Sequence, residues 1–322
     1  MGPEIINSLI AEDLKQVDAV ISHRLSSDVV LIRQVADYII ASGGKRLRPA
    51  LLILSARACG YQGTHHHELA AVVEFIHTAT LLHDDVVDDS HMRRGRATAN
   101  SLFGNAAAVL VGDFLYSRAF QMMVGVRSMR IMEVLADATN NIAEGEVMQL
   151  LHVRNANVNE QDYLRVIRAK TAKLFEAAGR LGAILAAVPP AQENALASYG
   201  MHLGTAFQLV DDILDYSGDL MQTGKNLGDD LAEGKTTLPI IHAMRHGSSE
   251  QETLIRNALV SGGLSEFEPV MEAMRETGAL DYTRMQAEAS ARHARDSIAV
   301  LTDSKYKDSL LELATFAVTR KY

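Results

Sequence analysis

Four aspartates at the end of an apolar helix place the strongest constraint on this sequence. The stretch Leu81 to Arg94 reads LLHDDVVDDSHMRR, and the nearly all-apolar segment before it, AAVVEFIHTATLLH, predicts a buried helix. At 3.6 residues per turn, Asp84 and Asp88 fall on one helical face, and Asp85 and Asp89 fall on the adjacent face. Like charges at this spacing repel each other, so a cation should lie beside them. Oxygen ligands with few nearby histidines suit Mg²⁺, which commonly binds one or two carboxylates together with substrate phosphate oxygens.

A second group of aspartates repeats this spacing. Asp211, Asp212 and Asp215 lie in GTAFQLVDDILDYSGD, again on an apolar helix and again just before a polar loop. Two such helices facing each other would enclose a cavity in which Mg²⁺ ions stabilise a diphosphate as a leaving group. The pattern therefore indicates a phosphorylated substrate.

Basic residues gather beside both groups of aspartates. GGKRLRP supplies Lys45, Arg46 and Arg48 behind a glycine turn, where backbone N–H groups can also bind an anion. The other basic residues near the motifs are Arg93, Arg94, Lys170, Lys173, Lys225 and Lys235. Any one of them could be a surface charge, but their placement favours an anion site next to each acid group.

The rest of the chain predicts an all-α fold. Apolar residues recur at three- and four-residue spacing, and strand signals are nearly absent. The expected helices are Ile5 to Leu25, Val29 to Ala41, RPALLILSARACG, the helix before Asp84, Ala106 to Val124, Ser128 to His152, Glu160 to Val188 and Ala191 to Tyr216. A polar loop from Ser217 to Gly234 and several shorter helices should follow.

Composition narrows the class of protein. A net charge of -9 argues against a nucleic-acid partner, which would need a broad basic surface. The single Cys59 excludes a disulfide framework, and neither a secretory signal pattern nor an apolar run of membrane-spanning length is evident. We therefore expect a cytoplasmic protein. His65, His66 and His67 lie in a polar stretch that favours a solvated turn over a metal site.

These motifs, in this order, resemble those of the trans-isoprenyl diphosphate synthase family. The matching segments are GGKRLRP, the first acid motif with Arg93 and Arg94, Lys170-Thr171, FQLVDDILD and GKTTLP, over about residues 40 to 240. Bacterial long-chain members are the most alike. The resemblance implies one domain, residues 1–322, with roughly ten or more helices around a deep central cavity.

The resemblance also implies the role of each matching residue. Asp84, Asp88, Asp211, Asp212 and Asp215 would bind roughly two to three Mg²⁺ ions. The allylic diphosphate would contact Arg93, Lys170, Thr171, Gln208, Lys225 and Lys235. Isopentenyl diphosphate would contact Lys45, Arg48, His77 and Arg94. The catalytic group would comprise Asp84, Asp85, Asp88, Arg93, Lys170, Thr171, Gln208 and Asp211.

The reaction implied is Mg²⁺-dependent condensation of isopentenyl diphosphate with an allylic diphosphate, farnesyl diphosphate being the expected primer. Octaprenyl diphosphate is the expected product, destined for a quinone side chain. A homodimer is typical of the family, and the apolar tail of the product suggests no more than transient membrane contact during its release. Product length should depend on Ala79 and Thr80, about one turn before Asp84, and on Met122 and Met123 as deeper floor residues. Both methionines could equally be ordinary core residues.

Several alternatives remain open at this stage. The same motifs fit products from hexaprenyl to decaprenyl diphosphate, or a non-catalytic subunit of a heteromeric synthase. A terpene cyclase would carry an Asn/Ser/Glu-type second metal motif instead of DDILD. A ferritin-like di-metal bundle needs two Glu-x-x-His pairs, and Glu74 to His77 is the only one in the chain.

Overall fold

The structure, a computed structural model, describes residues 8–41, 44–93, 95–217, 227–262 and 264–320. The helices up to residue 152 are α2 (Ala11–Arg24), α3 (Val30–Ala41), α4 (Leu47–Ala58), α5 (His65–Val87), α6 (Ala99–Phe103), α7 (Asn105–Gly125) and α8 (Met129–His152). The later ones are α9 (Glu160–Ile167), a π-helical turn (Arg168–Ala172), α10 (Lys173–Leu185), α11 (Pro190–Ser217), α13 (Asp229–Glu233), α14 (Leu238–His246), α15 (Ser249–Ser261), α16 (Phe267–Glu276), α17 (Ala279–Ser297) and α18 (Lys305–Thr319), with 3₁₀ turns at Leu264–Glu266 and Ile298–Val300.

The predicted all-α fold is confirmed. In the part of the chain that the structure describes, the strands are β1 (Met92–Arg93) and β2 (Arg96–Ala97), which pair antiparallel. The prediction of one continuous helix from Glu160 to Val188 is wrong in one respect, because a π-helical turn separates α9 from α10. The start of the first expected helix and residues 218–226 of the expected polar loop lie outside the described residues. No helix in the described ranges is both long enough and apolar enough to cross a membrane.

The chain forms two compact units. The first comprises Met1–Thr139, Leu174–Gly200 and Arg295–Leu313, and the second comprises Asn140–Lys173, Met201–Ala294 and Ala314–Tyr322.

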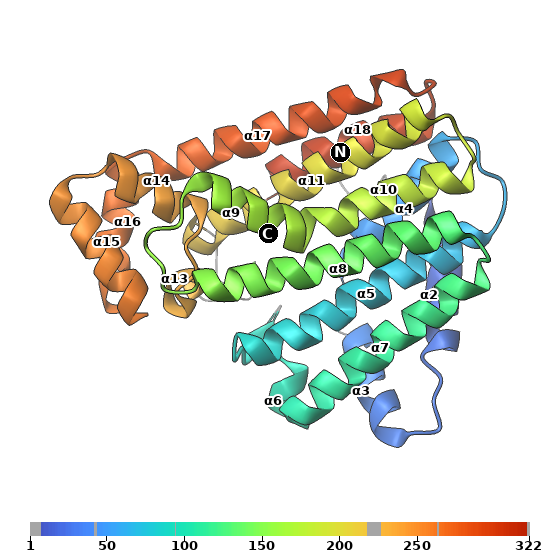
Figure 1. Ribbon diagram of the computed structural model, residues 1–322, viewed down its shortest axis with the longest axis horizontal. Helices are drawn as coiled ribbons and strands as arrows, with labels where there is room; N and C mark the ends of the chain where they lie inside the picture. The colour runs from blue at the N-terminus through green and yellow to red at the C-terminus, as the bar shows by residue number, and fades with distance from the viewer. Residues whose placement is uncertain (1–7, 42–43, 94, 218–226, 263, 321–322) are drawn as a thin grey trace. The chain divides into compact units, whose positions relative to one another are not determined.

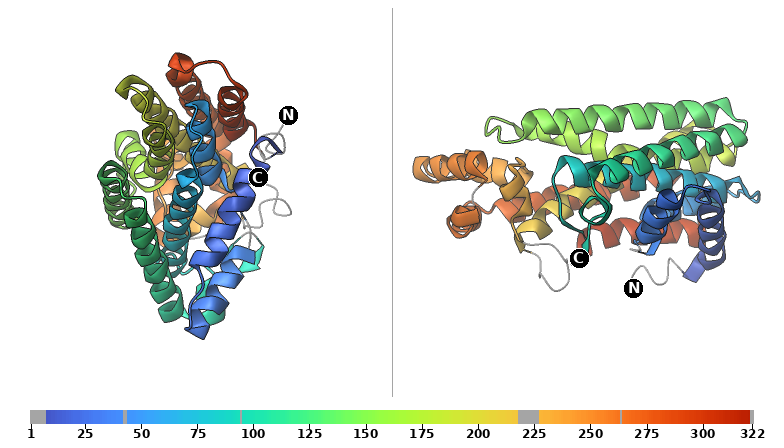
Figure 2. Two further views of the ribbon diagram at one scale, coloured as in Figure 1. Left: turned by 90° about the vertical axis from the view of Figure 1, so that its right-hand side faces the viewer. Right: turned by 90° about the horizontal axis from the view of Figure 1, so that it is seen from below.

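Helix α5 is the centre of the first unit. It packs against α2, α4, α6 and α7 (Figure 1, Figure 2). Residues 69–76 of α5 are all buried, and among them Val73, Phe75 and Ile76 are at most 2% exposed. Each such side chain contributes about 1.5–3 kcal/mol of burial free energy. Gly112 on α7 leaves room for the His83 ring, because a Cβ there would lie 2.3 Å from Nε2 of His83.

The histidine triplet at the start of α5 differs from its prediction as a solvated turn. His66 is fully buried, so the expectation of a solvated turn is wrong. Nε2 of His66 and of His67 lie 2.9 and 2.8 Å from Oδ1 of Asp13 on α2, and Arg57 on α4 donates to the same carboxylate. Burial acts to raise the pKa of Asp13, but the hydrogen bonds from Arg57 and the two histidines outweigh it and hold that pKa well below its usual range. One carboxylate therefore joins three helices.

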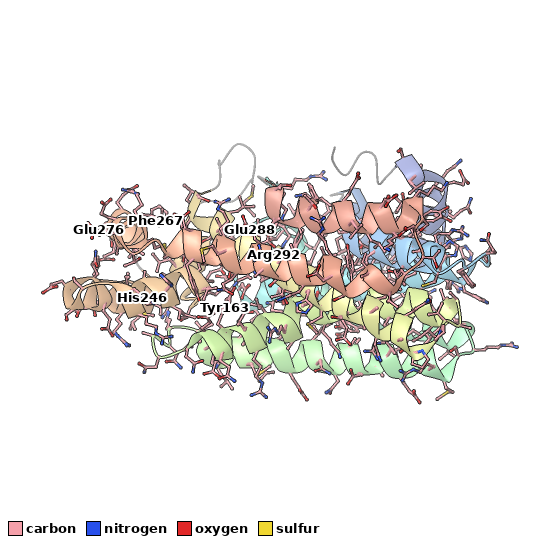
Figure 3. All side chains as sticks on the ribbon, turned by 90° about the horizontal axis from the view of Figure 1, so that it is seen from above. Tyr163, His246, Phe267, Glu276, Glu288 and Arg292 are labelled. Carbon is pink, nitrogen blue, oxygen red and sulfur yellow. The ribbon has the colours of Figure 1, made fainter. Side chains whose placement is uncertain are left out.

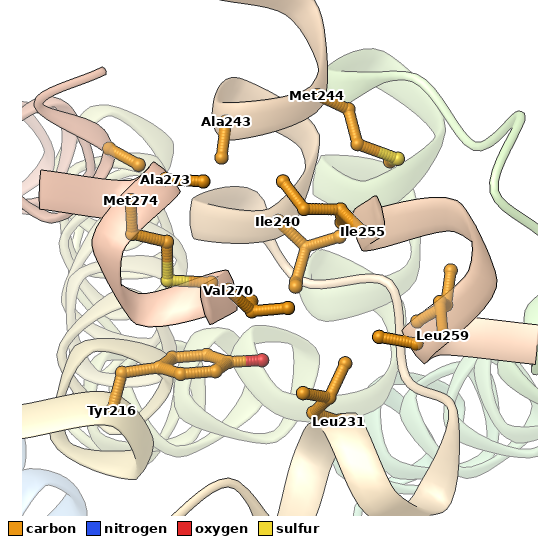
Figure 4. Close-up of a cluster of buried hydrophobic side chains, with 12 residues drawn as sticks. Tyr216, Leu231, Ile240, Ala243, Met244, Ile255, Leu259, Val270, Ala273 and Met274 are labelled. Carbon is orange, nitrogen blue, oxygen red and sulfur yellow. The ribbon is translucent and has the colours of Figure 1, made fainter. Parts of the chain in front are cut away.

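Two clusters of buried apolar side chains lie in the described part of the second unit. One gathers Tyr216 and residues of α13 to α16, among them Leu231, Ile240, Ile255 and Val270 (Figure 4). The other joins α9, α11, α14 and α17 through residues that include Ile167, Leu209, Leu238 and Ala287. This second cluster holds α11 in place, and α11 carries the second group of aspartates.

Candidate active site

The first acid group lies at the end of α5, and its members differ in exposure. Asp85 is 4% exposed, whereas Asp84 and Asp88 are partly exposed. Arg93 on β1 donates to Oδ1 of Asp85, with Nε at 2.8 Å and Nη2 at 2.7 Å. Burial raises the pKa of Asp85, and Arg93 opposes that shift. Asp85 is thus the buried member of the group, and Asp84 and Asp88 are its partly exposed members.

The backbone at the C-terminal end of α5 holds the aspartates of the first acid group in place. Asp89 has a φ of 50°, the left-handed conformation that Asp tolerates better than most residues. The N–H groups of Ser90 and Asp89 donate to the carbonyls of Asp85 and Val86 at 2.9 and 3.4 Å, a Schellman motif that ends the helix. Asn100 on α6 donates to the carbonyls of Asp85 and Ser90 at 3.1 and 3.3 Å. Asn100 could not be predicted from the sequence, because it carries no charge and belongs to no motif.

Two residues predicted to bind isopentenyl diphosphate lie together in the first unit. Nη1 of Arg48 is 3.2 Å from Nε2 of His77, and the Arg48 guanidinium lies over the Phe175 ring, 4.3 Å from its centroid. Lys45 is half-buried in the segment before α4. Arg94 lies outside the described residues.

His77 also lines a pocket within the first unit. Side chains of α2, α3, α5 and α7 form most of its apolar wall. Two ion pairs also line it: Arg46 donates to Glu74 at 2.7 Å, and Arg93 contacts Asp85. An apolar pocket with a few charged groups suits an amphiphilic ligand with an anionic end.

The predicted chain-length residues are all in the first unit. Ala79 is fully buried, and Thr80 donates its hydroxyl hydrogen to the carbonyl of His77 at 2.7 Å. Met122 and Met123 on α7 are each 1% exposed. Ala79, Met122 and Met123 are core residues and Thr80 is partly exposed; their control of product length stays a prediction.

In the second unit, Asp212 lies at the end of a chain of hydrogen bonds. Tyr163 of α9 (Figure 3) donates to Oδ2 of Asp212, and Nε2 of Gln208 donates to Oδ1 at 2.8 Å. Thr171 in turn donates to Oε1 of Gln208 at 3.0 Å. Burial, with the charge of Asp230, raises the pKa of Asp212 well above its usual value, and the hydrogen bonds from Tyr163 and Gln208 act against this. The predicted residues Thr171, Gln208 and Asp212 therefore form one network.

Asp211 has a cationic partner near the C-terminus. Nη2 of Arg320 donates to Oδ1 of Asp211 and to the carbonyl of Phe207, both at 2.7 Å. The Arg320 side chain is 2% exposed, and its guanidinium stacks 3.8 Å from the centroid of the Phe207 ring. Sequence reasoning missed Arg320, because 109 residues separate it from Asp211.

Asp215 completes the second acid group. Its Oδ2 accepts a hydrogen bond from the backbone N–H of Asp230 in the first turn of α13, at 3.2 Å. Beyond α13, Nζ of Lys235 lies 2.5 Å from Oε2 of Glu233. Lys225, the other lysine predicted in this segment, lies outside the described residues.

Lys170 lies within the π-helical turn, a kind of irregularity that is frequent at functional sites. Its Nζ is 2.7 Å from Oε2 of Glu146 on α8. A Cβ at Gly145 would lie 2.7 Å from the backbone nitrogen of Lys170, so glycine is needed for α8 to approach the turn this closely.

The donors of both acid groups fit a hard divalent cation. Asp84, Asp88, Asp211 and Asp215 offer carboxylate oxygens that are partly exposed, and Mg²⁺ prefers oxygen ligands of this kind. Asp212 has both oxygens occupied by protein donors, so it suits a supporting position better than direct metal binding.

The polyprenyl synthetase family model matches residues 29–276, a range that includes both acid groups and GGKRLRP. The chain belongs to the polyprenyl synthetase family. The octaprenyl diphosphate synthase of Escherichia coli (strain K12) is 54% identical over 321 residues, covering 99% of this chain and 99% of the relative. An all-trans-nonaprenyl-diphosphate synthase of Rhodobacter capsulatus is 44% identical and covers 97% of this chain and 96% of its own length.

Among solved structures, a polyprenyl synthase from Caulobacter crescentus CB15, complexed with calcium and isoprenyl diphosphate, matches with a TM-score of 0.96 at 44% identity. The match covers 100% of this chain and 98% of that one. These similarities confirm the resemblance drawn from the motifs and the prediction of a prenyltransferase. They give no support to the ferritin-like and terpene cyclase alternatives.

Proposed function

We propose that this polyprenyl synthetase makes octaprenyl diphosphate by successive addition of isopentenyl diphosphate to an allylic diphosphate, with farnesyl diphosphate as the primer. The observation that carries this proposal is the 54% identity to the Escherichia coli octaprenyl diphosphate synthase over nearly the whole of both chains. The lower identity to a nonaprenyl enzyme favours octaprenyl over longer products. The product would serve as a quinone side chain.

We assign the metal sites to the partly exposed carboxylates. Asp84 and Asp88 would hold Mg²⁺ at the allylic diphosphate, and Asp211 with Asp215 would hold a further ion. When bound, Mg²⁺ draws charge from the diphosphate and makes it a better leaving group. The presence of calcium and isoprenyl diphosphate in the Caulobacter relative supports a divalent cation next to a diphosphate.

The chain's own residues would position the two substrates. Lys45, Arg48, His77 and Arg94 would bind isopentenyl diphosphate, while Arg93, Lys170, Lys225 and Lys235 would bind the allylic diphosphate. The close contact of Arg48 with His77 supports the first set.

Positioning and electrostatics then provide the rate enhancement. Thr171 and Gln208 would place oxygen atoms toward the allylic carbon as its bond to the diphosphate breaks and positive charge develops there. The double bond of isopentenyl diphosphate attacks that carbon, and the departing diphosphate takes up the proton that is lost. Water must be excluded, because it would capture the cation. Asp212, itself held by Tyr163, would fix the orientation of the Gln208 side chain.

We further propose that residues 1–322 act as one catalytic domain in a cytoplasmic homodimer that contacts membrane only while releasing product. An exposed apolar face on α7 supports a second copy as the partner: Leu110, Phe120 and Val124 are 66%, 40% and 56% exposed. Contiguous apolar surface of this kind is typical of protein interfaces. Sedimentation equilibrium of the wild type and of Leu110→Glu would test this homodimer. We expect a dimeric wild type and a monomeric variant.

Product length provides the test of the proposed product. Ala79→Tyr adds a bulky ring at a fully buried position one turn before Asp84, and we expect it to shorten the main product below octaprenyl. Incubation with farnesyl diphosphate and labelled isopentenyl diphosphate, followed by dephosphorylation and reversed-phase chromatography, measures this directly.

Val87→Tyr is the matched control, because Val87 lies on the same helix and is 66% exposed. It should leave the product distribution unchanged. A folded Ala79→Tyr variant that still makes mainly octaprenyl product would contradict the assignment of Ala79. A wild type whose main product is hexaprenyl or decaprenyl would contradict the assignment of chain length.

A further inference from the structure

A group of metal-ligating atoms lies away from both acid groups, at the start of α5. Among the described residues, Asp13, His66 and His67 each offer one ligand atom, and these three atoms lie within 4.8 Å of one another. Nε2 of His66 and Nε2 of His67 both point at the same oxygen, Oδ1 of Asp13, from 2.9 and 2.8 Å. Two imidazole nitrogens therefore meet at one carboxylate oxygen, close enough for all three atoms to bind a single ion.

We propose that Asp13, His66 and His67 form a binding site for a transition-metal ion, with Zn²⁺ as the ion that fits best. Imidazole nitrogen suits Zn²⁺, whereas Mg²⁺ prefers oxygen, so this site differs in chemistry from the acid groups. Zinc lies about 2.0–2.1 Å from histidine nitrogen, which puts tetrahedral ligand atoms about 3.3 Å apart. Each N···O pair here needs to open by only a few tenths of an ångström to admit the ion.

The two rings are already held in place. His66 is fully buried and the His67 side chain is 15% exposed, with ring centroids 3.9 Å apart. The Tyr61 ring packs edge-on against His66 at 5.6 Å between centroids. Because packing fixes these orientations, the ion would bind with little loss of side-chain entropy.

Arg57 would act as the outer partner of the site. It donates to Oδ2 of Asp13 from Nε at 3.3 Å and to Oδ1 from Nη2 at 2.7 Å. The ion would replace the contact to Oδ1 and leave the one to Oδ2, which keeps the carboxylate oriented. The positive charge of Arg57 weakens the site, so we expect weaker binding than at zinc sites without a neighbouring cation.

Metal binding also shifts a proton within each ring, from Nε2 to Nδ1. Nδ1 of His66 is buried and has no hydrogen-bond partner in the described part of the chain, so the proton that it gains has no acceptor there, which further weakens binding. The bound ion would join α2 to the first turn of α5. Because the ion binds the folded chain, it should raise the thermal stability of the protein.

The test uses the full chain, stripped with chelator and then given one equivalent of Zn²⁺ in a large excess of Mg²⁺. Mg²⁺ occupies the carboxylate sites but competes poorly for imidazole. After gel filtration, elemental analysis should find one zinc per chain in the wild type and in His65→Ala, whose side chain is exposed. His67→Ala and Asp13→Asn should bind zinc at least about tenfold more weakly.

Two further measurements separate the site from a folding defect. In a constant excess of Mg²⁺, added Zn²⁺ should further raise the melting temperature of the wild type and of His65→Ala but not that of His67→Ala. Co²⁺ in place of Zn²⁺ should give the visible absorption of a nitrogen-ligated ion only when both histidines are present. Absence of zinc from the wild type, or equal zinc in the wild type and a folded His67→Ala, would overturn the proposal.

Discussion

The two acid groups share one spacing but have different surroundings. In each, the second aspartate is buried: Asp85 is 4% exposed and Asp212 is 2% exposed. Asp85 is paired with a guanidinium, that of Arg93, whereas Asp212 accepts hydrogen bonds from the neutral donors Tyr163 and Gln208. In the second group the cation is instead at the first aspartate, where Arg320 contacts Asp211.

This difference shows what the spacing determines and what it does not. An apolar helix with DDxxD at its end turns the second aspartate inward, because that position continues the buried face. The partner that stabilises the buried carboxylate comes from elsewhere in the fold. In the first group this partner is Arg93, eight residues from Asp85 in the sequence. In the second group it is Tyr163, 49 residues from Asp212.

The largest expected effect is loss of activity when a partly exposed aspartate of either group is removed. Asp84→Ala and Asp211→Ala should each lower kcat about a thousandfold, because each removes a ligand that stabilises the leaving diphosphate. Steady-state rates with farnesyl and isopentenyl diphosphates at saturating Mg²⁺ measure this. Asp89→Asn, at an exposed position where Asn tolerates the left-handed conformation, is the control and should stay near wild-type activity. Retention of more than about a tenth of the activity in Asp84→Ala would show that the first group does not act as proposed.

The next largest effect is on the free energy of unfolding, which should fall more when a buried aspartate loses a charged partner than when it loses a neutral one. Arg93→Gln leaves the buried Asp85 carboxylate without its cation and should cost about 2–3 kcal/mol of unfolding free energy. Tyr163→Phe removes one neutral hydrogen bond to Asp212 and should cost about 1 kcal/mol. Urea unfolding of the two variants ranks them. A larger loss of unfolding free energy in Tyr163→Phe would show that the neutral partner stabilises its aspartate more than the charged partner does.

The smallest effect is a change in Mg²⁺ dependence. Arg320→Gln removes a positive charge that contacts Asp211, so the Mg²⁺ concentration giving half-maximal rate should fall several-fold. Calorimetric titration with Mg²⁺ should show the same change without turnover. Lys305→Gln, at an exposed position on α18, serves as the control. An unchanged or higher Mg²⁺ requirement in Arg320→Gln would mean that Arg320 does not compete with the metal.

Much of the fold followed from local patterns. Apolar spacing predicted most of the helices, and the acid and basic motifs singled out Asp84, Asp211 and Lys170 as candidate site residues. The π-helical turn around Lys170 could not be predicted, because a change of hydrogen-bond register leaves no mark on apolar spacing.

Contacts between distant segments account for the other misses. The histidine triplet looked like a solvated turn because its partner, Asp13, lies 53 residues from His66 in the sequence. The Arg320 contact with Asp211 was hidden for the same reason. Sequence spacing identifies chemistry carried by one helix, whereas a network closed by a distant side chain appears only in the folded chain.

The most direct test of the proposed function is elongation by the purified chain alone. The protein is incubated with farnesyl diphosphate, labelled isopentenyl diphosphate and Mg²⁺, with EDTA added to a parallel sample. Our account predicts octaprenyl diphosphate as the main product, no product with EDTA, and none from Asp84→Ala. An inactive wild-type chain that elongates only after a second protein is added would contradict the account and identify it as one subunit of a heteromeric synthase.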